Sequence, residues 1–224
     1  MAAAIRFWGS FVAQSYFFSF DGVDGVGKST QHALFCEWLR EQGHDVVACR
    51  DPGSTQLGEA IRHILLQDHG TPIHRRSEML LYMAARAQLV EEVIRPALAA
   101  SKTVVSDRFL LANVVYQSVG GNVPAARLWE MGDWANDGMS PDLTLLLDMP
   151  ATAAMDRIAG TTDRMERRGT AYMESVREAF LNELPKSSRS TAIINADRDA
   201  DAVARDIAQV VDQFLMDASS PAIA

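Results

Sequence analysis

Cysteine is scarce in this chain of 224 residues, and acidic residues outnumber basic ones. The two cysteines, Cys36 and Cys49, have neither the spacing of metal ligands nor the density of a disulfide framework, which favours a reducing cytoplasm. The formal net charge of -8 excludes a general attraction to nucleic-acid phosphates, so any phosphate recognition must be local. The sequence also lacks internal repeats and low-complexity tracts, and its length suits one well-packed domain.

The first sixteen residues contain no long apolar run and carry one charged side chain, Arg6. They are too short and too broken to span a membrane, and they lack the apolar core and cleavage site of a secretory signal. We expect residues 1–16 to be an extension that is disordered, packed on the surface, or translated from an upstream start codon that is not used. Residues 17–218 are then the single domain, without a membrane or nucleic-acid partner.

A glycine-rich segment follows the apolar, aromatic run at residues 16–20 and fits the pattern G-x-x-x-x-G-K-[ST]. Its glycines let successive backbone N–H groups face a phosphate, Lys28 reaches the β and γ oxygens, and the Ser29 hydroxyl ligates Mg2+. The helical pattern behind it, ended by Gly43, points its positive end at the same anion. The predicted site for a nucleoside triphosphate consists of Gly22, Val23, Asp24, Gly25, Val26, Gly27, Lys28, Ser29 and Thr30.

Short apolar runs alternate with amphipathic helical patterns along the rest of the chain. The predicted strands lie at residues 16–20, 46–49, 103–106, 143–147 and 191–194. Predicted helices include one near residues 57–65, one over 77–100 that is interrupted by Pro96, two over 112–119 and 124–136, and a terminal one through 203–214. The pattern predicts an α/β fold of the P-loop NTPase type, with a five-stranded parallel sheet and helices on both faces.

Polar residues lie where these strands end, and ligands of such sheets bind beyond the carboxyl ends of the strands. The candidates are Asp24, Asp51, Asp107 with Arg108, and Asp148. Asp107 suits Mg2+, and Arg108 presents a planar fork to a phosphate. The alternative is that Asp107 and Arg108 form an ion pair that caps the next helix.

Tyr82 and Arg86 lie four residues apart and share one helix face, where they suit stacking on a base and donation to its carbonyl oxygens. A core tyrosine beside a surface arginine is the alternative.

Residues 160–169 are polar, bounded by glycines and rich in arginine. We expect a lid at about residues 160–170 that delivers an arginine to a transferring phosphoryl group, with a solvated helix start as the alternative.

Taken in order, these segments resemble the thymidylate kinases, nucleoside monophosphate kinases that convert dTMP to dTDP with ATP and Mg2+. The resemblance covers residues 17–214 and rests on the segments 21–30, 51–59, 80–86, 107–109, 116–117, 141–148 and 163–166. It implies a cytoplasmic, ATP-dependent phosphotransferase that is a homodimer, with the helical region at 77–100 as a possible interface. Its small-molecule substrates are dTMP and ATP.

The resemblance also implies roles for individual residues. Tyr82 matches the aromatic that stacks on thymine, Arg86 the arginine that contacts the base carbonyl, and Arg108 the arginine that holds the dTMP phosphate. Asn113 faces the base edge and Tyr116 crowds the 2' position. The implied substrate-binding set is Asp24, Pro52, Tyr82, Arg86, Arg108, Asn113, Tyr116 and Gln117, and the implied metal ligands are Ser29 and Asp107.

The catalytic set implied by the resemblance is Lys28, Arg108, Asp24 and a lid arginine. Family members place the catalytic basic residue either in the P-loop or in the lid. Because Gly25 occupies the P-loop position, we expect the bacterial-type arrangement with Arg164 in this role. The alternatives for that role are Arg157, Arg167 and Arg168.

The chain departs from the family pattern in a few places. Asp21 and Asp51 replace glutamates, Ala112 replaces a serine, and Ser54 places a Cβ where glycine would permit a positive φ. Family members often have a cis proline in this turn, at the bond that would join Asp51 and Pro52 here.

Two alternatives to the thymidylate kinase function stay open. One is another P-loop nucleotide or deoxynucleoside kinase, and the other, of a different class, is a non-catalytic nucleotide-binding scaffold. A guanine-reading N-K-x-D motif is missing from the sequence.

Overall fold

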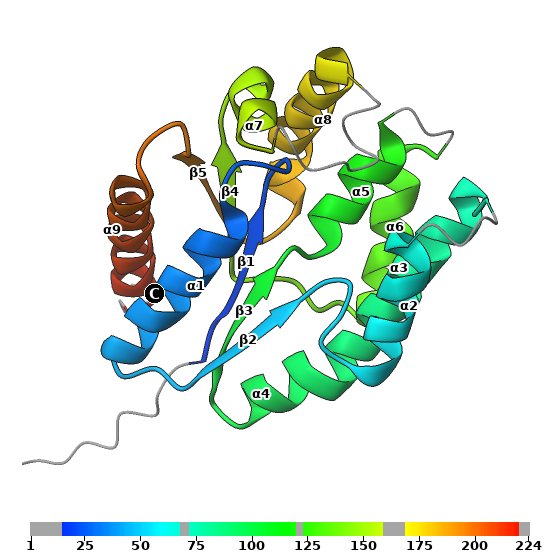
Figure 1. The fold of residues 1–224 in the computed structure, drawn as a ribbon. Helices are drawn as coiled ribbons and strands as arrows, with labels where there is room; N and C mark the ends of the chain where they lie inside the picture. The colour runs from blue at the N-terminus through cyan, green and yellow to red at the C-terminus, as the bar shows by residue number, and fades with distance from the viewer. Residues whose placement is uncertain (1–14, 68–71, 120–122, 159–168, 220–224) are drawn as a thin grey trace, which may run out of the picture.

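A parallel β-sheet lies at the centre of the fold (Figure 1). The computed structural model describes residues 15–67, 72–119, 123–158 and 169–219. The strands are β1 (Phe17–Asp21), β2 (Val46–Arg50), β3 (Thr103–Asp107), β4 (Leu143–Asp148) and β5 (Ser190–Asn195). Their order in the sheet is β2-β3-β1-β4-β5, and every neighbouring pair is parallel. The predicted five-stranded parallel sheet is therefore confirmed.

Helices connect the strands. They are α1 (Lys28–Glu41), α2 (Gln56–Leu66), α3 (Arg75–Leu89), α4 (Arg95–Ala99), α5 (Leu110–Ser118), α6 (Ala125–Asn136), α7 (Ala151–Ile158), α8 (Gly169–Glu183) and α9 (Ala200–Ser219). Gly43, with φ +90°, follows the end of α1 as predicted. Helices α7 and α8 have no counterpart among the sequence predictions.

Both faces of the sheet are covered, and aromatic side chains of β1 mark the two sides. Phe18 and Phe20 each lie with their ring centroids 5.4 Å from Phe35 of α1, which runs beside α9 (Figure 1). Phe17 packs edge-to-face against Phe109 at 5.0 Å, in the cluster that contains residues of α3, α5 and α6. The central strands β1, β3 and β4 are mostly buried, whereas the edge strands β2 and β5 have exposed positions, such as Ile193, which is 56% exposed.

The long helical region after residue 75 is interrupted earlier than predicted. A π-helical turn over Val90–Ile94 separates α3 from α4, and Pro96, where the interruption was predicted, lies in the first turn of α4. Proline lacks an N–H and clashes with the carbonyl four residues before it, which the wider π-turn accommodates.

Both cysteines are buried and unpaired, Cys36 in α1 and Cys49 in β2. Burial raises the pKa of the Cys36 thiol to about 11 and that of Cys49 to about 12.

Among the described helices, none has the length and apolar character that crossing a bilayer requires. Of the predicted extension, residues 1–14 lie outside the described ranges.

Candidate active site

The glycine-rich loop between β1 and α1 is pressed against the end of β4 and against α7. Gly22 has φ +139°, and a Cβ there would lie 2.4 Å from the carbonyl oxygen of Leu147. Gly25 has φ +89°, and its Cβ would lie 2.1 Å from the carbonyl oxygen of Ala154. Only glycine fits these two positions, since a side chain would meet backbone atoms that have no freedom to move. The loop therefore has the compact backbone cradle that a phosphate chain requires.

Lys28 begins α1 and folds back over this loop. Its Nζ donates to the carbonyl oxygen of Val23 at 2.7 Å and lies 3.5 Å from Oδ1 of Asp24. The N-terminus of α1 faces the loop, so the helix dipole and the ammonium group together favour an anion there.

Arg108 connects the loop to a second pocket. Its backbone has φ +69°, which is uncommon for a residue with a side chain. The guanidinium donates to the carbonyl oxygen of Gly22 at 3.2 Å and to the carboxylate of Asp24, and it lies 5.2 Å from the ring centroid of Tyr116. The ion-pair partner of Arg108 is thus Asp24 and not Asp107, and the N-cap of α5 receives no side-chain hydrogen bond. The alternative of a helix-capping pair is wrong.

The second pocket, which we call the acceptor pocket, has a volume of about 370 Å³. All eight residues of the implied substrate-binding set line it: Asp24, Pro52, Tyr82, Arg86, Arg108, Asn113, Tyr116 and Gln117. Its lining also includes residues that the sequence analysis did not select for a binding role, among them Arg62, Arg75, Glu78 and Phe109. Asp148, in contrast, is not among the lining residues and forms a two-point ion pair with Arg177 of α8, at 2.7 and 2.8 Å.

Arg86 lies at the bottom of the acceptor pocket and is 1% exposed, so it is not a surface arginine. Its Nε donates to Oδ2 of Asp51 at 2.5 Å, and its Nη1 donates to Oδ1 of Asn113 at 3.1 Å. With Oδ1 occupied in this way, the amide of Asn113 has only its Nδ2 group left to offer, and this group is buried with no partner among the described residues. The pocket therefore suits a ligand with carbonyl acceptors.

The charged groups beneath the two sites are strongly perturbed. Asp21, at the end of β1, is fully buried, and neither of its carboxylate oxygens has a partner among the described residues. Burial raises the pKa of Asp21 to about 8, although Arg108 opposes the shift. Burial also lowers the pKa of Lys28 to about 8 and raises that of Asp51. Perturbed groups of this kind are concentrated at functional sites.

The profile of the family described as Thymidylate kinase matches residues 20–207. This chain belongs to the thymidylate kinase family. The thymidylate kinase of Rhodopirellula baltica is 52% identical over 190 residues, which cover 85% of this chain and 77% of the relative. The enzyme of Nitrosomonas eutropha is 40% identical over 200 residues, covering 88% and 93%, and that of Thermosipho africanus is 40% identical over 200 residues, covering 89% and 98%.

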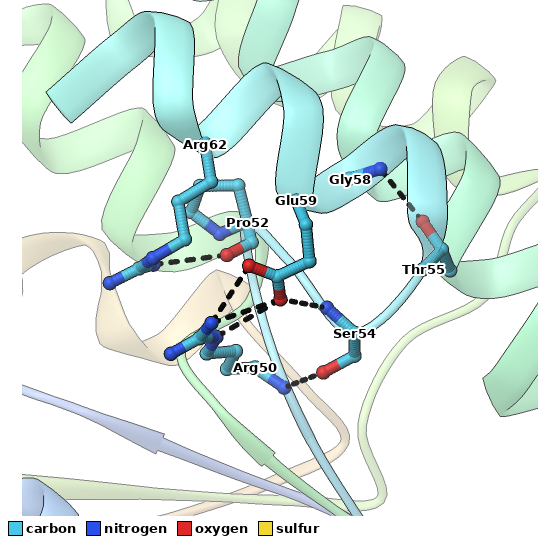
Figure 2. Close-up of polar contacts among 7 residues, drawn as sticks. All are labelled: Arg50, Pro52, Ser54, Thr55, Gly58, Glu59 and Arg62. Atoms are coloured by element: carbon cyan, nitrogen blue, oxygen red, sulfur yellow. Dashed lines mark hydrogen bonds and ion pairs between the residues drawn. The ribbon is translucent and has the colours of Figure 1, made fainter. Parts of the chain in front are cut away.

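The turn after β2 also has the features expected of a thymidylate kinase. The bond between Asp51 and Pro52 is cis, in line with the resemblance, although the sequence alone did not establish it. Ser54 has φ +63°, so this serine adopts the backbone conformation for which the family pattern provides a glycine. Thr55 then caps α2 by accepting the N–H of Gly58 at 2.8 Å (Figure 2).

The residues expected to hold Mg2+ in a thymidylate kinase fit that role. Ser29 is the second residue of α1, next to the phosphate cradle, and Oδ1 of Asp107 is buried with no partner among the described residues. No three metal-ligating side chains converge within the described ranges. One hydroxyl and one carboxylate suit Mg2+, which usually keeps most of its coordination for substrate phosphates and water.

The predicted thymidylate kinase lid is mostly outside the described part of the chain. Arg164, Arg167 and Arg168 belong to residues 159–168 and lie outside it. Arg157 in α7 is described, and its Nη2 lies 4.0 Å from Oδ1 of Asp197.

Proposed function

We propose that this chain transfers the γ-phosphoryl group of ATP to dTMP, with ATP in the P-loop and dTMP in the acceptor pocket. The observation that carries this assignment is the position of Arg108, which contacts the P-loop at Gly22 and also lines the acceptor pocket. A guanidinium placed between two phosphate sites serves a reaction in which one phosphate attacks another.

The donor side of the proposed reaction is held by the P-loop. The loop amides and Lys28 bind the β and γ phosphates. The Lys28 ammonium group, which donates to the carbonyl oxygen of Val23, would donate to phosphate oxygens when the nucleotide binds. When Mg2+ is bound at Ser29 and Asp107, it neutralises charge on the phosphates. We assign the catalytic arginine of the lid to Arg164, which lies outside the described residues. No general base is required, because the acceptor is already an ionised phosphate.

The acceptor side supports recognition of a pyrimidine. We assign Tyr82 to stacking on the base and Arg86 with Asn113 to its carbonyl edge, since both present buried donors to the pocket. Arg108 holds the acceptor phosphate and Asp24 lies beside the sugar 3'-hydroxyl. We assign Tyr116, whose ring centroid lies 5.2 Å from the Arg108 guanidinium, to crowding the sugar 2' position, a role that would favour deoxyribonucleotides. Pro52 and Gln117 complete the substrate-binding set.

The two alternatives leave part of this arrangement unused. A deoxynucleoside kinase would have no acceptor phosphate for Arg108. A non-catalytic scaffold would have no need for an acceptor pocket that adjoins the P-loop through that same arginine.

We further propose a homodimer that forms through helices α3 and α6. A groove between these helices is lined mostly by apolar residues: Leu80, Met83, Ala84, Ala87, Glu130, Met131, Trp134 and Ala135. Trp134 is 86% exposed and Leu80 is 52% exposed, which is unusual for large apolar side chains unless a partner covers them. The unpaired thiols of Cys36 and Cys49 favour the cytoplasm as the location.

The deciding experiment is a coupled ADP-release assay with ATP, Mg2+ and a panel of dTMP, dUMP, dCMP, UMP and thymidine. We expect strong turnover with dTMP and loss of dTMP affinity in Arg108→Met, with Arg40→Met as the control because Arg40 is exposed in the last turn of α1 and lines neither the acceptor pocket nor the proposed interface. Turnover of thymidine alone would replace the proposal with the nucleoside kinase alternative. ATP binding without transfer would replace it with the scaffold.

The dimer is tested separately by analytical ultracentrifugation. Trp134→Glu places a charge on the proposed interface and should produce a monomer. A wild-type protein that sediments as a monomer would refute the dimer without affecting the assignment of the reaction.

A further inference from the structure

Three side chains hold the turn after β2 from its solvent side (Figure 2). Arg50 and Glu59 form a two-point ion pair, with Nη2 of Arg50 2.8 Å and 3.0 Å from the two carboxylate oxygens. Oε1 of Glu59 also accepts the backbone N–H of Ser54 at 2.8 Å, and Oγ of Ser54 accepts the backbone N–H of Arg50 at 2.9 Å. We call Arg50, Ser54 and Glu59 the turn latch.

The latch is packed directly onto the backbone of the turn. Gly53 has φ +143°, and a Cβ there would lie 2.7 Å from Oε1 of Glu59 and 2.9 Å from Nε of Arg50. Ser54 is in the left-handed region, which costs a residue with a side chain free energy unless its surroundings hold it there. The two hydrogen bonds of Ser54 within the latch provide that restraint.

The turn after β2, in turn, accepts hydrogen bonds from two arginines of the acceptor pocket. Arg86 donates from Nε to Oδ2 of Asp51. Arg62 donates from Nη1 to the carbonyl oxygen of Pro52 at 3.0 Å, as Figure 2 shows. Both arginines line the pocket, whereas Arg50 and Glu59 do not. A shift of the turn would therefore move both guanidinium groups together.

We propose that Arg50 and Glu59 are positioning residues for the acceptor site, which set the affinity for the acceptor nucleotide by fixing the turn that holds Arg62 and Arg86. This inference rests on the proposed function. The side chains of Arg50 and Glu59 are 48% and 44% exposed, and exposed ion pairs contribute little to folding. Their loss should therefore appear in binding of the acceptor and not in stability.

The test compares Glu59→Ala, Glu59→Gln and Glu91→Ala. The glutamine keeps a neutral oxygen for the N–H of Ser54, whereas the alanine removes the acceptor altogether. Glu91→Ala is the matched control, because Glu91 is also an exposed helical glutamate paired with an arginine, Arg95, at 3.2 Å. For each variant we would measure KM for dTMP, KM for ATP, kcat and the thermal unfolding midpoint, and record the Nε–H resonance of Arg86 without nucleotide.

Glu59→Ala should raise KM for dTMP on the order of tenfold, because small displacements of positioning groups have effects of this size or larger. Its kcat, its KM for ATP and its unfolding midpoint should match those of the control. Glu59→Gln should recover part of the dTMP affinity. The Nε–H resonance of Arg86 should shift in Glu59→Ala and stay unchanged in Glu91→Ala.

Two results would overturn the proposal: a KM for dTMP equal to that of the control, or a rise in KM that follows a fall in the unfolding midpoint. If the wild-type protein does not phosphorylate dTMP, the proposed function fails on its own. The Arg86 resonance then decides for or against the latch, since it requires no substrate.

Discussion

Replacing Asp21 with asparagine should stabilise the nucleotide-free protein at neutral pH. Asp21 is fully buried without a partner among the described residues, and burial raises its pKa from 3.8 to about 8. Between these two values the folded protein binds a proton that the unfolded chain has lost, so stability falls as the pH rises through the interval. The interval is about four pH units, and each unit corresponds to ~1.36 kcal/mol. The gain in unfolding free energy from Asp21→Asn therefore has an upper limit on the order of 5 kcal/mol.

The assay is urea unfolding of wild type and Asp21→Asn at several values between pH 4 and pH 9. The difference in unfolding free energy should be near zero at pH 4, grow in favour of the variant up to pH 8, and level off above it. Lys28, whose pKa burial lowers to about 8, interacts electrostatically with Asp21, so its titration does not cancel in the difference; the slope is therefore read between pH 4 and pH 7, below the pKa of Lys28. Asp45→Asn is the control, because Asp45 is 66% exposed. A difference that does not change with pH would refute the reasoning.

Three further substitutions test the two sites. Gly25→Ala places a Cβ 2.1 Å from the carbonyl oxygen of Ala154 at φ +89°, so it should cost about 1–3 kcal/mol in urea unfolding and raise KM for ATP; an unchanged unfolding curve would contradict the loop geometry. Asp51→Ala leaves Arg86 buried without its carboxylate and should cost about 3–5 kcal/mol, and a loss well below this in the same assay would show that Arg86 finds another partner. Arg164→Ala should lower kcat by about 10³–10⁵ with little change in KM, whereas a full steady-state rate would assign the role to another lid arginine.

The sheet was predictable from the sequence because each strand is an apolar run that ends at a polar or glycine-containing segment. Every predicted strand lies within one residue of the strand in the structure, as at β3 (Thr103–Asp107). Helices α7 and α8, which flank the charged segment at 160–169, were not predicted: α7 has only 8 residues, and α8 buries only Met173, Val176 and Phe180. The position of the break before Pro96 depends on a π-turn, which has no signature in the apolar pattern.

The lining of the acceptor pocket was predictable because the resemblance placed individual residues, and all eight of them came together. The polar partners within it were not. Asp51 and Arg86 are 35 positions apart, so their hydrogen bond depends on how α3 packs against the turn after β2. Arg62 had a local signal, since it lies one helical turn after Glu59 in α2, but its place on the pocket wall follows from the packing of α2 on α3. The binding roles of these residues stay predictions.

The burial of both thiols makes the protein a convenient background for site-directed labelling. With pKa values of about 11 and about 12, Cys36 and Cys49 hold almost no thiolate at neutral pH, and the thiolate is the reactive form. A single cysteine introduced on the surface, for example at Trp134 in the proposed interface, would therefore be the one that reacts with a maleimide dye or a spin label. Distances between protomers and movements around the acceptor pocket then become measurable without first removing the native cysteines.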